Sequence, residues 1–242
     1  MHELETYARK YNSPEYFKTD PIIFPKHFCE LLQRREACLQ DVEIAAVIAA
    51  HLAWGRRDMI VRDCNRAFDE MGWHPYDYVR GGCYRDEDKS LHRTVKWSEF
   101  AKICRNLKLF YEENESLEIL SQDEMRTRIY GQKSDPSAAN KKINMLRRWM
   151  VRNDGIVDMG LWKHISPADL IIPLDVHVHR VALETGLTKR RQADLKTALE
   201  ITEGLKKNLP RRSLPGRFRV VRLRGGACSR KSGLITVSCL LP

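Results

Sequence analysis

The sequence predicts an all-α fold. Three observations lead to this prediction: apolar residues recur at helical spacing in several segments, β-strand signals are scarce before residue 211, and the composition, 43% hydrophobic and 31% charged, is that of a globular protein. No run of eighteen or more apolar residues is present, so a transmembrane span is not expected. The first residues lack the plan of a signal peptide, so we expect a cytoplasmic protein.

The first two predicted helices cover residues 41–54 and 98–111. Residues 41–54, DVEIAAVIAAHLAW, carry Ala and Ile on almost every face, which is typical of a helix buried centrally in a core. Gly55 is expected to end this helix. In the second helix Ser98 is expected to be the N-cap. Its apolar residues at helical spacing are Phe100, Ile103, Leu107 and Phe110.

Further helices complete the predicted body. They span residues 137–151, a short segment from 166, residues 175–185, and residues 194–207. We therefore predict a helical domain over residues 1–210, built as one or two lobes. No cysteine is spaced as C-x-x-C, and the seven cysteines are odd in number, so neither a zinc ribbon nor a disulfide framework is expected, and we predict no cofactor.

The tail, residues 211–242, differs from the rest of the chain in charge. It contains seven Arg, one Lys and no acidic residue, a net charge of +8, while residues 1–210 carry +2 of the total of +10. The tail thus supplies nearly all of the basic excess that would otherwise indicate nucleic-acid binding. Its segments FRVVRL and LITVSCLL are β-like. We expect this tail to be poorly ordered.

The stretch Leu174–Val181, LDVHVHRV, admits two interpretations. On a strand, Asp175, His177 and His179 would share one face and could bind zinc or another divalent metal, as in a metal-dependent hydrolase. On a helix, Asp175 would be the N-cap and the two histidines would point in different directions. The helical period lasts longer than the strand alternation and favours the helix. It runs through Val178, Val181, Ala182 and Thr185.

The same stretch resembles the signature D-T-H-V-x-R-V of the helix-hairpin-helix DNA glycosylases, the HhH-GPD superfamily. Asp175 stands on the aspartate that, in that superfamily, caps a helix beside the flipped nucleotide. The surrounding matches are His177, Val178, Arg180 and Val181. Val176 stands where the superfamily usually has Thr. The resemblance implies an HhH-GPD-like helical fold.

A second, shorter resemblance lies upstream. Residues 140–145, NKKINM, resemble the superfamily's K-T-A-N-V-V stretch, with Lys141 on its lysine and Asn144 on its asparagine. The usual L-P-G-V-G hairpin is absent, and GQKSDPSAAN stands in its place. The spacing between Lys141 and Asp175 is similar to that of the archaeal 8-oxoguanine glycosylases, and the missing four-cysteine cluster argues against an iron–sulfur glycosylase.

These resemblances imply a base-excision DNA glycosylase with AP-lyase activity. Its partner would be damaged duplex DNA and its substrate an oxidised base such as 8-oxoguanine; no obligate protein partner is evident. Lys141 would be the nucleophile, with Lys142 as the alternative, and Asp175 would stabilise positive charge on the sugar. Lys142, His177 and Arg180 would contact the nucleic acid. A DNA-binding module that uses the same fold without catalysis is the second interpretation.

Other residues also fit DNA, although each has a simpler structural explanation. The aromatic candidates for stacking on a base are Trp54, Trp97, Phe110 and Trp162, and large aromatic residues at helical spacing are more often part of a core. Residues 55–58, GRRD, and 92–94, HRT, could contact phosphates, or they could be caps stabilised by salt bridges.

A wider resemblance covers most of the chain. TDPIIFP, AAHLAWGRRDMI, LHRTV and ISPADLIIPLDVHVHRVA resemble segments of a family of conserved bacterial proteins with no assigned activity. Members of that family typically close with a segment resembling D-P-x-x-Y-D-F-A-L-F-G-L-G, whereas this chain has RRSLPGRFRVVRLRGG. We therefore hypothesise a reading-frame shift near residue 210. An uninterrupted frame with the same tail in close relatives would contradict this hypothesis.

Overall fold

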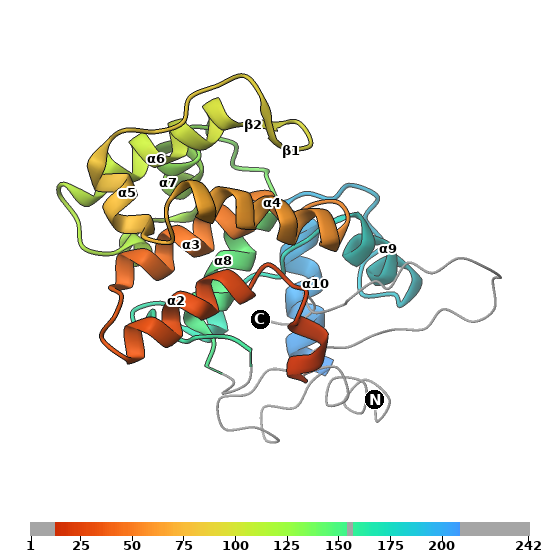
Figure 1. Cartoon of the computed structure of the whole chain (residues 1–242). Coiled ribbons are helices and arrows are strands. Elements are labelled where there is room, and N and C mark those ends of the chain that lie inside the picture. The colour runs from red at the N-terminus through yellow and green to blue at the C-terminus, as the bar shows by residue number, and fades with distance from the viewer. Residues whose placement is uncertain (1–12, 154–156, 209–242) are drawn as a thin grey trace. The chain divides into compact units, whose positions relative to one another are not determined.

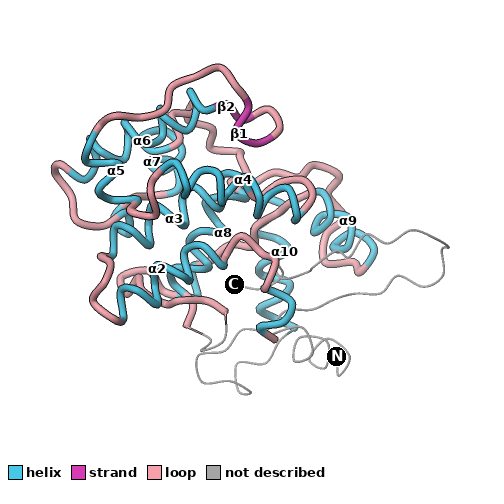
Figure 2. The backbone as a smooth tube through the Cα atoms, in the orientation of Figure 1, coloured by secondary structure: helices cyan, strands magenta, loops and turns pink. Residues whose placement is uncertain are grey.

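The computed structural model describes residues 13–153 and 157–208, which are mostly helical and include one small two-stranded sheet (Figures 1 and 2). The prediction that the body of the chain is mostly helical is confirmed. The described residues form two compact units: the N-terminal unit is Phe17–Asp135, and the C-terminal unit contains the described residues before 17 and after 135. The predictions made for the tail lie outside the described residues.

The N-terminal unit contains most of the described helices. After the 3-10 turn η1 (Pro14–Phe17), its elements are α2 (Ile23–Gln33), α3 (Leu39–Leu52), α4 (Arg57–Glu70), α5 (Pro75–Gly81), β1 (Ser90–His92), β2 (Val95–Lys96), α6 (Trp97–Tyr111), η2 (Leu117–Ile119), α7 (Gln122–Glu124) and the π-helical turn η3 (Met125–Ile129). Strands β1 and β2 pair antiparallel, and His92 lies opposite Val95.

Helix α3 is the centre of this unit. Every residue from Val42 to Leu52 is buried, and α2, α4 and α5 all contact the helix. Burial on all sides explains why its sequence is apolar all round. The predicted helix over 41–54 is thus confirmed, although it ends at Leu52, and Gly55 lies beyond it at a φ of +102°.

The predicted cap of α6 is wrong. The helix begins at Trp97, after Lys96 as N-cap, so Ser98 lies inside the first turn. The reason is the preceding hairpin. The backbone N–H groups of Trp97 and Ser98 donate to the carbonyls of Lys89 and Glu87, so this helix start requires no side-chain cap.

The described helices of the C-terminal unit are α8 (Lys141–Val151), the 3-10 turn η4 (Pro167–Asp169), α9 (Val176–Glu184) and α10 (Leu195–Asn208). Its buried core comprises Ile172, Leu174, Val178, Val181, Ala182, Ala198, Ile201 and Leu205. Full burial of a large aliphatic side chain contributes about 1.5–3 kcal/mol, so this cluster fixes how α9 packs on α10. None of the helices in the described ranges is both long enough and apolar enough to cross a bilayer.

Candidate active site

Asp175 is the N-cap of α9. Its backbone is extended, and its Oδ1 accepts hydrogen bonds from the backbone N–H groups of His177 at 3.0 Å and Val178 at 2.9 Å. These bonds satisfy two of the donors that a helix start leaves without an intrahelical partner. The structure therefore confirms the helical interpretation of LDVHVHRV.

Lys141 is the first residue of α8. The helix was predicted from residue 137 but begins at 141, because Asn140 adopts a left-handed conformation with a φ of +46°. The buried side chain of Asn144 fixes this turn, since its Nδ2 donates to the carbonyl of Ala139 at 2.9 Å. A lysine at a helix N-terminus opposes the helix dipole, so helix stability alone does not favour this residue here.

The two residues meet although 34 positions separate them in sequence. Lys141 Nζ lies 3.4 Å from Asp175 Oδ2, and their side chains are 30% and 26% exposed. Oδ1 is occupied by the α9 backbone, while Oδ2 faces the amine. The arrangement thus places a primary amine and a carboxylate together within reach of solvent, each fixed at the start of a helix.

The three predicted nucleic-acid contacts lie on the same two helices. Lys142 follows Lys141 and is partly exposed; successive helical residues point about 100° apart, so the two lysines face different directions. His177 is exposed in the first turn of α9. Arg180 is also exposed, and its Nε lies 4.0 Å from Glu184 Oε1.

The metal interpretation of Asp175, His177 and His179 is wrong. His179 is buried, and its Nε2 donates to the carbonyl of Arg190 at 2.8 Å, whereas His177 is exposed. Over residues 13–153 and 157–208, no three His, Cys, Asp or Glu side chains lie close enough together to hold a metal. On helix α9 the rings of His177 and His179 point in different directions, so they cannot bind the same metal ion.

Two arginines at the C-terminal end of α8 are buried. Arg148 and Arg152 both pair with Asp158, at 3.6 and 3.3 Å, and all three side chains are nearly inaccessible. Burial also lowers the pKa of the neighbouring Arg147. Arg148 and Arg152 therefore do not contribute to an exposed basic surface. The basic candidates that remain exposed near the pair are those at the starts of α8 and α9.

Most of the aromatic candidates belong to the core. Trp97, Phe110 and Trp162 are buried, whereas Trp54 is exposed. Sequence reasoning missed Asp63, which is fully buried in α4 and pairs with His92. A signal for it exists: Asp63 falls on the apolar stripe of its helix. That stripe comprises Ile60, Cys64, Ala67 and Phe68.

The fold and the site define a helical protein with a lysine and an aspartate paired at two helix N-termini. The chain belongs to the family described as "Protein of unknown function (DUF2400)", which matches residues 20–134 and 121–218. The matched range contains both Lys141 and Asp175, and residues 219–242 of the tail lie outside it. Neither a search of curated proteins nor a search of solved structures gave a match.

Proposed function

We propose that the protein is a DNA glycosylase with AP-lyase activity on an HhH-GPD-like helical fold, and that it removes an oxidised base such as 8-oxoguanine from duplex DNA. The observation that carries the proposal is the 3.4 Å pair of Lys141 Nζ and Asp175 Oδ2. Two separate short motifs predict Lys141 as the nucleophile and Asp175 as the charge stabiliser. Both roles require them to reach the same sugar carbon.

The first requirement of the reaction is access to the glycosidic bond. A base inside a duplex must be extruded into the site, which costs a few kcal/mol. The partly exposed Lys141 and Asp175 side chains allow a nucleotide to approach both groups. Lys142 lies in the first turn of α8, and His177 and Arg180 lie in the first two turns of α9; these are the groups that we assign to phosphate contacts.

Asp175 stabilises the charge that develops when the base leaves. The bond from the anomeric carbon to the base breaks, its electron pair leaves with the base, and positive charge appears on the sugar. A fixed carboxylate nearby lowers the energy of that state. Because Oδ1 is held by the backbone of α9, Oδ2 is already oriented before substrate binds.

Lys141 is the nucleophile. Once Nζ has given up a proton to solvent, its lone pair forms a bond to the anomeric carbon as the base departs. The nitrogen then loses a second proton to solvent, the bond between the anomeric carbon and the ring oxygen breaks, and that oxygen becomes a hydroxyl, which leaves a Schiff base that permits strand cleavage. Lys142 is less suited to this role, because it is Lys141 that faces the carboxylate.

Borohydride trapping tests the proposal. Borohydride reduces a Schiff base to a stable amine, so a reacting lysine remains covalently attached to DNA. We expect the purified full chain to form an adduct with a duplex that contains 8-oxoguanine or an abasic site, and none with an undamaged duplex. Lys141→Ala should abolish the adduct, and Lys142→Ala should retain it.

Two results would contradict the proposal. One is the absence of both an adduct and base release on 8-oxoguanine, uracil, thymine glycol and abasic duplexes, from protein shown to be folded. The other is an adduct that survives Lys141→Ala. If the chain binds DNA without either reaction, the non-catalytic DNA-binding interpretation replaces this one.

A further inference from the structure

Trp54 is an exposed aromatic residue held at a fixed place in the N-terminal unit. It follows α3, its side chain is 36% exposed, and its indole N–H has no hydrogen-bond partner among the residues that the structure describes. The part of the ring that is open to solvent can accept a stacked aromatic ligand.

Arg93 lies against this ring. Its guanidinium carbon is 4.5 Å from the centre of the Trp54 ring, and within the described ranges no carboxylate pairs with it. Arg93 occupies the turn between β1 and β2 at a φ of +53°, a conformation that costs energy in a residue other than glycine. Gly55 lies next to Arg93: its φ is +102°, a conformation that L side chains rarely adopt, and a Cβ there would lie 2.7 Å from Arg93 Nη1.

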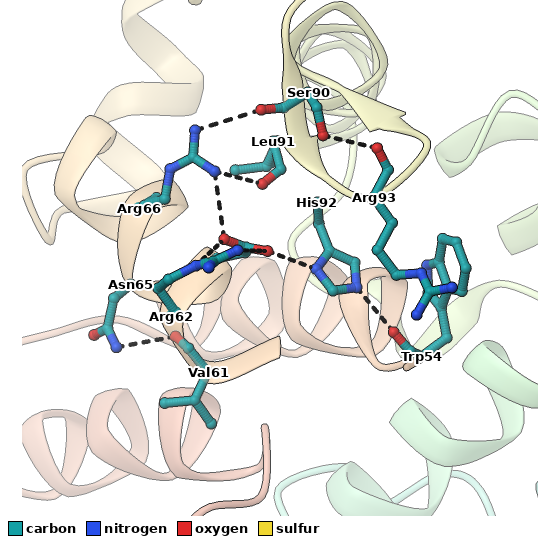
Figure 3. A network of polar contacts seen from close by, with 10 residues as sticks. Trp54, Val61, Arg62, Asn65, Arg66, Ser90, Leu91, His92 and Arg93 are labelled. Atoms are coloured by element: carbon teal, nitrogen blue, oxygen red, sulfur yellow. Dashed lines mark hydrogen bonds and ion pairs between the residues drawn. The ribbon is translucent and has the colours of Figure 1, made fainter. Parts of the chain in front are cut away.

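A buried polar network connects the two residues (Figure 3). His92 Nε2 lies 2.9 Å from the Trp54 carbonyl oxygen, and His92 Nδ1 lies 2.8 Å from Asp63 Oδ2. Arg66 contacts both Asp63 Oδ1, at 3.3 Å, and the carbonyl of Leu91, at 2.8 Å. The network fixes the backbone on each side of the Trp54–Arg93 pair. It thus joins the two motifs GRRD and HRT, which the sequence places about 35 residues apart.

We propose that Trp54 and Arg93 bind one nucleotide of a DNA strand, with the base stacked on the indole and the phosphate held by the guanidinium. Aromatic stacking accepts any base, and Arg matches phosphate through a planar set of donors. Arg56, two residues after Trp54 in the sequence, has a second exposed guanidinium, which also forms an ion pair with Asp58. The choice of DNA as the ligand rests on the proposed function, whereas the surface itself belongs to the N-terminal unit.

Equilibrium binding tests this surface. A fluorescein-labelled single-stranded oligonucleotide and a duplex containing an abasic site are titrated with the full chain, without borohydride, at two salt concentrations. Base stacking on one aromatic side chain contributes enough to affinity that Trp54→Ala should weaken binding about tenfold. Arg93→Gln should weaken binding and also lower the salt dependence by about one phosphate contact.

Two matched variants are the controls. Leu109→Ala removes another exposed apolar side chain, 64% exposed, and Arg80→Gln removes another guanidinium that lies over a ring, that of Tyr76. Both should bind DNA like the wild type. All variants carry the same basic tail, so its contribution cancels from the comparison.

The outcomes separate this inference from the proposed function. If Trp54→Ala and Arg93→Gln bind like their controls, or if the wild type binds neither oligonucleotide, the nucleotide surface is overturned. If Trp54-dependent binding is found but no lysine is trapped on any lesion, the surface stands and the glycosylase assignment fails. If an adduct forms through Lys141 but binding does not depend on Trp54, only the surface is lost.

Discussion

The Asp175 side chain has two separable roles. Its Oδ1 caps α9, and its Oδ2 faces Lys141. A cap requires only a hydrogen-bond acceptor, whereas stabilising a cationic sugar requires a full negative charge. A substitution that keeps the hydrogen-bond acceptor but removes the charge can therefore separate the capping role from the electrostatic role.

Asp175→Asn should leave the free energy of unfolding within a few tenths of a kcal/mol of wild type, because Asn and Asp are similar N-caps. Asp175→Ala should lower it by about 1 kcal/mol. Base release should fall sharply in both variants, because both lack the charge. Urea unfolding and a single-turnover assay measure the two properties. Full base release by Asp175→Asn would contradict the electrostatic role.

Asp63 links stability to pH. Burial would raise the pKa of Asp63, but hydrogen bonds from Arg62, His92 and Arg66 outweigh burial and lower that pKa. A lowered pKa in the folded state contributes stability above the pKa of the unfolded chain, about 3.9, and this stability is lost as the pH falls through the folded value.

Asp63→Asn should therefore destabilise the protein by about 3 kcal/mol at pH 7, since it breaks a buried pair. The difference from wild type should shrink as the pH falls below about 4. Urea unfolding across pH 3–7 measures it, and Asp58→Asn, a change at an exposed position on the same helix, is the control. A difference that stays constant with pH would contradict this linkage.

At the scale of elements, Glu43 joins α3 to the segment after α6. It is fully buried and accepts hydrogen bonds from Tyr111 Oη at 2.8 Å, Ser116 Oγ at 2.6 Å and the backbone N–H of Leu117 at 3.0 Å. Burial of the Tyr111 phenol raises its pKa, and the negative charge of the nearby Glu43 raises it further. The phenol therefore stays protonated and donates its hydrogen bond to Glu43. The end of α6 and the segment that follows it thus supply hydrogen bonds to an acidic residue that is fully buried in α3.

Glu43→Ala should cost about 3 kcal/mol of unfolding free energy, because it leaves buried donors without an acceptor. Tyr111→Phe removes only one of these bonds and should cost about 1 kcal/mol. Thermal or urea unfolding of both variants tests this order. Equal losses in the two variants would show that Glu43 does not act as the shared acceptor.

Helical periodicity predicted several of the helices whose burial is one-sided or complete. Helices α3, α6, α9 and α10 all appear near their predicted positions. Boundaries failed where a tertiary contact or one backbone angle decides them, as at Asn140 before α8 and at the hairpin before α6. Helices α2, α4 and α5 were not predicted, although the apolar stripe of α4 is regular. Strands β1 and β2 are too short to show the alternation of apolar and polar residues that predicts a strand.

At the scale of the whole molecule, the sequence identified Lys141 and Asp175 but not their separation. Local signals indicated the helix start at Asp175 but placed the start of α8 at residue 137 and not at Lys141. The 3.4 Å distance depends on how the C-terminal unit packs. The Asp63–His92–Trp54 network was not predicted, because its members come from three segments and two of them are buried. The spacing of these residues in the sequence does not indicate that they come together in the fold.

The most direct test of the central claim is to locate the covalent bond. The full chain is reduced with borohydride on an abasic duplex, digested with a protease, and the DNA-modified peptide is sequenced by mass spectrometry. Our account predicts a single modified residue, Lys141. Modification of Lys142 or of any other lysine, or no modified peptide from folded protein, would contradict it.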